Sequence, residues 1–172
     1  NVPQMPDVKS LNCKIKVRDN QVQGSAKVEG DSTGTFNTYP TITGVDITPS
    51  AGDETQDHTI WRAGLTGQKV IWTENDINNE ALISTVQVVY SPTGNPGSDG
   101  VVIKDSVNTH EICDTITAPL DLSYKAGVIR IRDKDTGFQD KVYGDSTESF
   151  SVLGRIVYGS SPALNADWYI GE

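Results

Sequence analysis

Several features that would point to a membrane protein or a familiar enzyme are missing from this sequence. No apolar run approaches the roughly 20 residues that a membrane-spanning helix needs. The chain of 172 residues has only two histidines, two cysteines and one methionine. It contains neither a G-x-S-x-G nucleophile elbow nor a glycine-rich loop that ends in Lys-Ser or Lys-Thr. We therefore expect no membrane insertion, no phosphate-binding loop and no catalytic activity.

Positive charge is also in short supply, and the formal net charge is -9. An acidic surface repels the phosphate backbone of nucleic acids and the anionic surface of a membrane, so we expect neither as a partner. The simplest consequence of this charge is solubility, with calcium binding or attraction to a basic partner as alternatives.

What the sequence does contain favours β-structure. Val, Ile and Thr outweigh Leu and Met, and β-branched side chains pack well on a pleated sheet but lose rotamer freedom in a helix. The predicted strands are Leu11–Arg18, Val22–Glu29, Thr41–Ile47, His58–Arg62, Lys69–Thr73, Ile83–Tyr90, Val101–Asp105, Glu111–Thr117, Gly127–Arg132, Gln139–Gly144, Phe150–Tyr158 and Asp167–Ile170. We expect an all-β fold, an antiparallel β-sandwich of Ig-like or jelly-roll-like type with about ten to twelve short strands.

The segments between these strands are rich in Gly, Pro, Asp and Ser, which favour turns. Gly44 and Gly154 interrupt apolar runs, as glycines do at bulges or sharp bends. The stretch Glu74–Leu82 predicts at most one short helix. Because no repeat or linker is visible, we expect a single domain over residues 1–172, with residues 1–10 as an extended lead-in.

The two cysteines, Cys13 and Cys113, are too far apart in sequence for a compact metal or redox motif. Cys13 belongs to an alternating run in which odd positions are apolar, which predicts that it lies on the buried face of a strand. We expect the two cysteines to form a disulfide, with two buried free thiols as the alternative. The chain begins with Asn1, which indicates a removed leader or a trimmed start. Together these features predict export through an oxidising compartment to the cell surface or the extracellular space.

Calcium is the one metal that the sequence brings into consideration, and we expect no other cofactor. The segment from Asp133 to Asp140 alternates oxygen donors around Gly137, as loops that bind hard cations do. The candidate ligands are Asp133, Asp135 and Asp140. The same residues also suit an ordinary hairpin turn. Neither His58 nor His110 has zinc-finger spacing, and we expect His110 to be a half-exposed strand residue rather than a catalytic base.

Binding residues are expected in loops, because strand interiors are committed to packing and to backbone hydrogen bonds. The long predicted loops are Gly30–Pro40, Thr48–Asp57 and Ser91–Gly100. We expect Trp61 and Trp72 to pack in the core and Trp168 to be harder to bury. The candidate binding residues are Tyr39, Asp53, Asn95, Asp99, Trp168 and Tyr169.

These observations favour an extracellular structural or adhesive subunit of a pilus, fimbria or virion. Such a subunit binds neighbouring protein subunits or a host-surface glycan and performs no catalysis. A carbohydrate-binding module or lectin domain is the first alternative, since Asp, Asn and Trp in loops suit a sugar. A secreted hydrolase is the second alternative and ranks last, because no residue is identified as its nucleophile.

Overall fold

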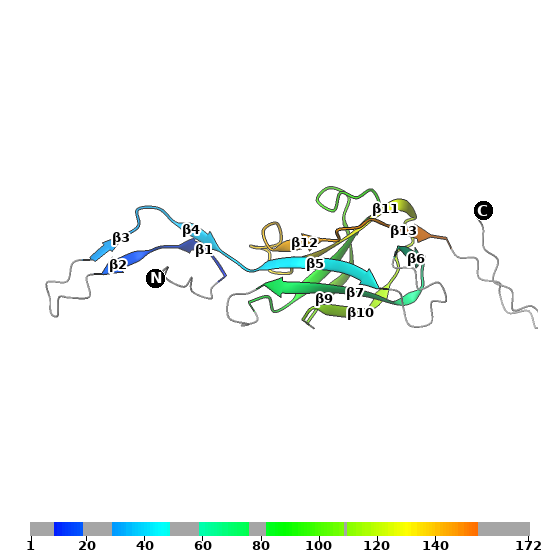
Figure 1. Cartoon of the computed structure of the whole chain (residues 1–172), viewed down its shortest axis with the longest axis horizontal. Helices are drawn as coiled ribbons and strands as arrows, with labels where there is room; N and C mark the ends of the chain where they lie inside the picture. Colours follow the sequence, from blue (N-terminus) through cyan, green and yellow to red (C-terminus); the bar gives the residue numbers. More distant parts are fainter. Residues whose placement is uncertain (1–8, 19–28, 49–58, 76–81, 109, 155–172) are drawn as a thin grey trace, which may run out of the picture. The chain divides into compact units, whose positions relative to one another are not determined.

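The computed structural model describes residues 9–18, 29–48, 59–75, 82–108 and 110–154 (Figure 1). These residues form thirteen strands and no helix, which confirms the all-β class. Because the described residues contain no helix, they contain none that is long and apolar enough to cross a membrane. The strands are β1 (Ser10–Cys13), β2 (Lys16–Arg18), β3 (Glu29–Asp31), β4 (Phe36–Thr38), β5 (Thr41–Thr48), β6 (Ile60–Arg62), β7 (Thr66–Asn75), β8 (Val86–Ser91), β9 (Val101–Val107), β10 (Ile112–Thr117), β11 (Ser123–Asp133), β12 (Tyr143–Asp145) and β13 (Phe150–Leu153).

The chain divides into two compact units, each described here by itself. The smaller unit comprises Asn1–Pro40 and Asp76–Leu82, and the larger comprises Thr41–Asn75 and Ile83–Glu172. We call strands β1 to β4 of the smaller unit the ribbon, and strands β5 to β13 of the larger unit the sandwich. That the whole chain forms one domain stays a prediction.

The ribbon is a pair of antiparallel segments, with β1 paired to β4 and β2 paired to β3. In the second pair Val17 lies opposite Gly30. Between the two strand pairs, the backbone amide of Ser32 donates to the carbonyl of Ile15 at 2.8 Å. The two pairs are thus consecutive parts of one two-stranded ribbon, shown in blue in Figure 1.

The sandwich contains a three-stranded sheet in the order β10-β7-β5 and a second sheet in the order β6-β13-β11-β8-β9. Strand β12 also pairs with β11. All of these pairs are antiparallel except β13 with β6, which is parallel. Strand β8, which lies between β11 and β9, is buried along its whole length.

The core lies between these two sheets and is built mostly from β-branched and aromatic side chains. Phe150 stacks at a tilt against Trp61, with 4.9 Å between ring centroids, and against Tyr90, with 5.9 Å. Ile129 and Ile131 of β11 are fully buried, and their neighbours Arg130 and Arg132 are only partly covered. The predicted alternation of this strand is therefore confirmed.

Two glycines shape the edge formed by β5 and β12. Gly44 has a φ of 59° and lies where the register of β5 against β7 shifts, so the bulge predicted there is confirmed. Gly144 of β12 packs against the backbone of Ile42. A Cβ at this position would lie 2.5 Å from the Ile42 carbonyl oxygen, so only glycine allows β12 to approach β5 this closely.

Some strand boundaries differ from those predicted. The run Leu11–Arg18 is divided into β1 and β2, and the expected loop Gly30–Pro40 contains β4. Most of Gln139–Gly144 forms turns, because the amides of Gln139 and Val142 donate to carbonyls four residues earlier and not to a neighbouring strand. Glu74 and Asn75 end β7, and residues 76–81 of the predicted helix lie outside the described residues, as do residues 22–28, 155–158 and 167–170.

Candidate functional site

The predicted disulfide between Cys13 and Cys113 is wrong, since both thiols are free. Cys13 belongs to the ribbon and is only half-buried, with its Sγ 3.2 Å from Thr38 Oγ1 across the strand pair. Cys113 is buried in β10 of the sandwich. Alternation indicated which face of its strand Cys13 occupies but not which sheet contains that strand. The two cysteines belong to different compact units.

The three aspartates proposed as calcium ligands form a turn. Asp133 is almost fully buried, and its Oδ1 accepts the backbone amide of Asp135 at 2.9 Å. Asp135 in turn accepts the amide of Gly137 at 3.1 Å, and Asp140 is exposed. Among the residues that the structure describes, no three His, Cys, Asp or Glu side chains are grouped to hold a metal ion. The arrangement matches the alternative interpretation of this segment as a hairpin turn.

The loop Ser91–Gly100 uses its own polar groups to fold back over β8. Asp99 accepts hydrogen bonds of 2.6 Å from the hydroxyls of both Ser91 and Thr93. These two hydrogen bonds lower the pKa of the Asp99 carboxyl below its ordinary value, and the bond from Ser91 has the largest effect. The backbone amide of Asn95 donates to Ser91 Oγ at 2.8 Å. Both predicted binding residues of this loop, Asn95 and Asp99, therefore have contacts that hold the loop in shape.

The remaining predicted residues separate into three groups. Tyr39 is 40% exposed in the smaller unit, where it remains accessible to a partner. Trp61 and Trp72 are buried, which confirms their expected place in the core. The other candidates, Asp53, Trp168 and Tyr169, and also His58, lie outside the described residues.

His110 belongs to a polar network at one end of β7. Its Nδ1 lies 2.9 Å from Glu74 Oε2, and the indole nitrogen of Trp72 donates to Glu74 Oε1 at 2.9 Å. The Glu74 amide also donates to the carboxylate of Glu111, a residue with a positive φ of 63°. The His110 side chain is about half exposed, at 49%. The network joins β7 to the start of β10 and gives each of its carboxylates a structural partner.

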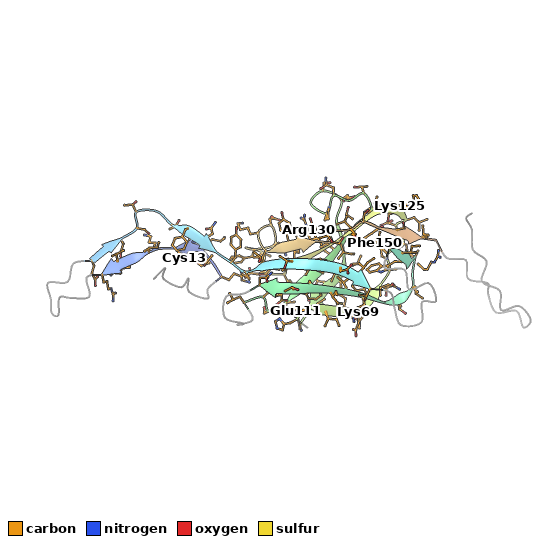
Figure 2. All side chains as sticks on the ribbon, viewed as in Figure 1. Cys13, Lys69, Glu111, Lys125, Arg130 and Phe150 are labelled. Atoms are coloured by element: carbon orange, nitrogen blue, oxygen red, sulfur yellow. The ribbon has the colours of Figure 1, made fainter. Side chains whose placement is uncertain are left out.

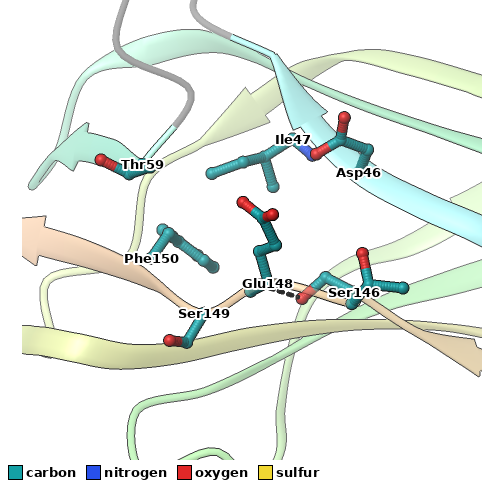
Figure 3. A pocket seen from close by; sticks show the side chains of 8 residues that line it. Asp46, Ile47, Thr59, Ser146, Glu148, Ser149 and Phe150 are labelled. Atoms are coloured by element: carbon teal, nitrogen blue, oxygen red, sulfur yellow. Dashed lines mark hydrogen bonds between the residues drawn. The ribbon is translucent and has the colours of Figure 1, made fainter.

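One pocket in the sandwich has a polar rim and an apolar floor (Figure 3). Its volume is about 300 Å³, and it is lined by Asp46, Ile47, Thr59, Ser146, Thr147, Glu148, Ser149 and Phe150. The Glu148 side chain points into the space between Ile47 and Phe150 in Figure 3. At least one hydroxyl of the rim already has a backbone partner, since the Ser149 hydroxyl donates a hydrogen bond to the Lys125 carbonyl at 2.9 Å. A pocket with carboxylates, hydroxyls and an apolar base suits a small polar ligand such as a sugar.

Three exposed apolar side chains, which we call the patch, lie in the segment from the end of β10 to the first residues of β11. Leu120, Leu122 and Tyr124 are 78%, 60% and 73% exposed. The backbone beneath them is firmly held, because Tyr90 donates to the Asp121 carbonyl at 3.0 Å and Ser123 accepts the Val152 amide at 3.2 Å. Large exposed apolar side chains on a hydrogen-bonded backbone are typical of a protein contact surface.

The ribbon has a second uncovered apolar surface, which we call the stripe and define by Ile15 and Val17. These side chains are 56% and 67% exposed. On the opposite face, Lys16 and Arg18 both reach Glu29, with N–O distances of 2.7 and 3.1 Å. Val17 lies between these two residues in the same strand, so its side chain occupies the other face. Charge and apolar surface are thus segregated to the two faces of the ribbon.

Neither the stripe nor the patch was among the predicted site residues. The alternation of Leu11–Arg18 identifies an apolar face, but sequence alone cannot indicate whether another sheet covers it. The patch stands in a short Leu-Asp-Leu-Ser-Tyr segment, in which apolar and polar residues alternate as they do in a strand with one buried face. No family model, curated protein or solved structure matches the chain.

Proposed function

We propose that this chain is a structural or adhesive subunit of an extracellular surface assembly, which acts by binding protein and not by catalysis. The observation that carries this proposal is the ribbon. It is a two-stranded element with an uncovered apolar stripe, and none of its described residues belongs to the hydrophobic core cluster. A two-stranded β-structure is marginally stable in water by itself, so a ribbon of this kind gains stability from a partner.

The exposed patch of Leu120, Leu122 and Tyr124 supports the same function. Subunits of assemblies need more than one contact surface, since one interface alone joins only two copies or two proteins. The patch and the stripe are different surfaces with uncovered apolar side chains. A subunit that is surrounded by neighbours uses both surfaces.

Photo-crosslinking in the native setting tests the proposal directly. A benzophenone amino acid replaces Val17 in the full chain, and the chain is expressed in its source and illuminated at the cell surface. We expect covalent adducts between position 17 and a neighbouring protein subunit, identified by mass spectrometry. The matched control carries the same group in place of Lys16, an exposed residue of the same strand on its opposite face. Adducts that are absent at both positions, or equally abundant at both, would overturn the proposal.

The pocket around Glu148 favours glycan binding as a second candidate function. Sugars are recognised by carboxylates and hydroxyls placed beside an apolar surface, which is the combination found here. The test is a glycan array followed by calorimetric titration of the best ligand. Glu148→Gln should abolish binding, while Lys141→Gln, a charge change outside the pocket lining, should leave it intact. A lack of any array signal with the folded full chain would remove this candidate.

A further inference from the structure

We infer that the pocket around Glu148 receives a basic side chain, a lysine or an arginine, from the partner protein. This inference rests on the proposed function and names the chemistry that one surface of the subunit recognises. Three observations on the pocket carry it: the place of its carboxylates, the lack of a cation among its lining residues and the hydrogen bonds of its donors.

Two carboxylates from distant parts of the chain meet at this pocket. Asp46 belongs to β5, and Glu148 lies just before β13. The Glu148 carboxylate lies between the side chains of Ile47 and Phe150 in Figure 3, and these two residues are only 4% and 2% exposed. A carboxylate beside apolar surface is less well hydrated than one in open solvent, so it gains more from a cation.

No cation of the described chain compensates these two carboxylates. The lining contains neither lysine nor arginine, and neither Asp46 nor Glu148 forms an ion pair with another described residue. Of the basic residues labelled in Figure 2, Arg130 binds Asp145, with 2.6 Å between Nε and Oδ1, and Lys125 lies over the ring of the tyrosine that precedes it. The charge of the pocket is thus left for a ligand to compensate.

The hydrogen bonds of the lining favour a ligand that donates. The Ser146 hydroxyl donates to the Glu148 carbonyl at 3.1 Å, and the Ser149 hydroxyl donates to a backbone carbonyl of β11 at 2.9 Å. The backbone amide of Ile47 donates to Asp46 Oδ1 at 2.8 Å. These three donors are already used, whereas the Glu148 carboxylate can only accept and receives no hydrogen bond from the described residues.

These features select a basic side chain over other ligands of a polar pocket. An ammonium or guanidinium group donates hydrogen bonds, accepts none and carries the charge that the pocket lacks. Its aliphatic stem can contact Ile47 and Phe150, as the stems of lysine and arginine do on apolar surfaces. A neutral sugar needs donors as well as acceptors, and an anion would meet two like charges. The net charge of -9 favours a basic partner in the same way.

NMR titration of the isotope-labelled full chain tests the pocket. The probe is Nα-acetyl-lysine methylamide, with the corresponding arginine compound as a second probe. We expect saturable shifts at the amides of Ile47, Glu148 and Phe150, and about tenfold weaker binding in Glu148→Gln, because a charged hydrogen bond is lost. Asp114→Asn, which removes an exposed carboxylate of β10 outside the lining, should bind like the unaltered chain. Shifts that are absent, or unchanged in Glu148→Gln, would overturn the inference.

Two further ligands distinguish charge from shape and protein from sugar. The Nε-acetylated form of the lysine probe keeps the stem but loses the charge, and it should give no saturable shifts. Glucosamine presents an ammonium group on a sugar ring, and we expect it to bind more weakly than the lysine probe. Tighter binding of glucosamine, or equal binding of the acetylated probe, would overturn the assignment to a basic side chain.

Photo-crosslinking separates this inference from the proposed function. A benzophenone amino acid in place of Thr147, a residue of the pocket lining, should give adducts with the partner at the cell surface, and these should be lost when Glu148→Gln is added. Adducts at Val17 without lysine binding at the pocket would leave the surface subunit standing and overturn this inference. Lysine binding without an adduct at either position would overturn the protein partner on which the inference rests.

Discussion

The ribbon and the sandwich are built from the same kinds of residue but reach stability in different ways. The sandwich places two sheets against each other and buries a shared core that includes Trp61, Phe150 and Ile131. The ribbon pairs two strands, and no other described strand of its own unit pairs with or covers them, so Ile15 and Val17 stay exposed. Backbone hydrogen bonds are present in both regions. The comparison shows that strand pairing alone does not complete a β-structure, because the apolar face of a sheet must also be covered.

The largest effect that distinguishes the two regions should come from removing a core aromatic ring. Phe150→Ala deletes a side chain that contacts both Trp61 and Tyr90, and we expect it to lower the free energy of unfolding by about 3–5 kcal/mol. Phe36→Ala in the ribbon is the matched control and should leave the main unfolding transition in place. Denaturant titration followed by tryptophan fluorescence measures both. Equal losses in the two variants would show that the ribbon shares the core of the sandwich.

A smaller effect is expected from adding one methyl group at a glycine. Gly144→Ala places a Cβ 2.5 Å from the Ile42 carbonyl oxygen, which forces β12 away from β5 and should cost about 1–3 kcal/mol. Gly30→Ala in the ribbon meets nothing within 4 Å and should leave the melting temperature of the sandwich unchanged. Calorimetry of the two variants provides the comparison. A stable Gly144→Ala protein would mean that β5 and β12 separate without penalty.

A pH effect is expected in the loop Ser91–Gly100 of the sandwich. Because the hydroxyls of Ser91 and Thr93 lower the pKa of Asp99, the stabilisation by this carboxylate is complete above the ordinary Asp pKa of about 3.9 and is lost as the pH falls through the lower value in the folded protein. Ser91→Ala should raise the pKa of Asp99 towards its ordinary value. Ser98→Ala, whose hydroxyl contacts the Asn95 carbonyl instead, should not. Carboxyl-carbon NMR titration reports the shift, and an unchanged Asp99 in Ser91→Ala would contradict it.

The smallest effect should come from the ion pairs of the ribbon. Lys16, with a smaller contribution from Arg18, lowers the pKa of Glu29, but all three side chains are well exposed to solvent. Exposed pairs contribute little to folding, so Glu29→Gln should leave the main unfolding transition unchanged at neutral pH. Hydrogen exchange at the amides of β2 and β3 should rise slightly. A clear drop in the melting temperature would show that the ribbon is part of the cooperative unit of the sandwich.

Prediction from sequence succeeded where a local pattern has one physical outcome. The alternation of Ile129 and Ile131 with Arg130 and Arg132 predicted which side chains of β11 face the core. Gly44 predicted a bulge, because a positive φ is readily adopted only by glycine. The strand Phe36–Thr38 was missed, since three residues between turn formers carry too little pattern to distinguish a strand from a loop.

The candidate sites were predicted less well, for a physical reason that differs from case to case. Asp133, Asp135 and Asp99 are oxygen donors in turn-rich segments, and such oxygens can bind a ligand or a neighbouring backbone amide equally well. Only their hydrogen bonds, for example from Ser91 to Asp99, show that the turns use them. The pocket combines β5, Thr59 and the segment from Ser146 to Phe150, which lie far apart along the chain.

The sequence by itself determined the all-β class, the burial of Trp61 and Trp72 and the alternation of the core strands. These features depend on residue type and spacing, which act over a few neighbours. Only the tertiary structure decided that Cys13 and Cys113 belong to different units, that Leu120 and Tyr124 stay exposed, and that the apolar stripe is uncovered. The reason is that an apolar strand face has the same sequence whether or not another sheet packs against it. The assignment of each face depends on contacts between distant segments of the chain.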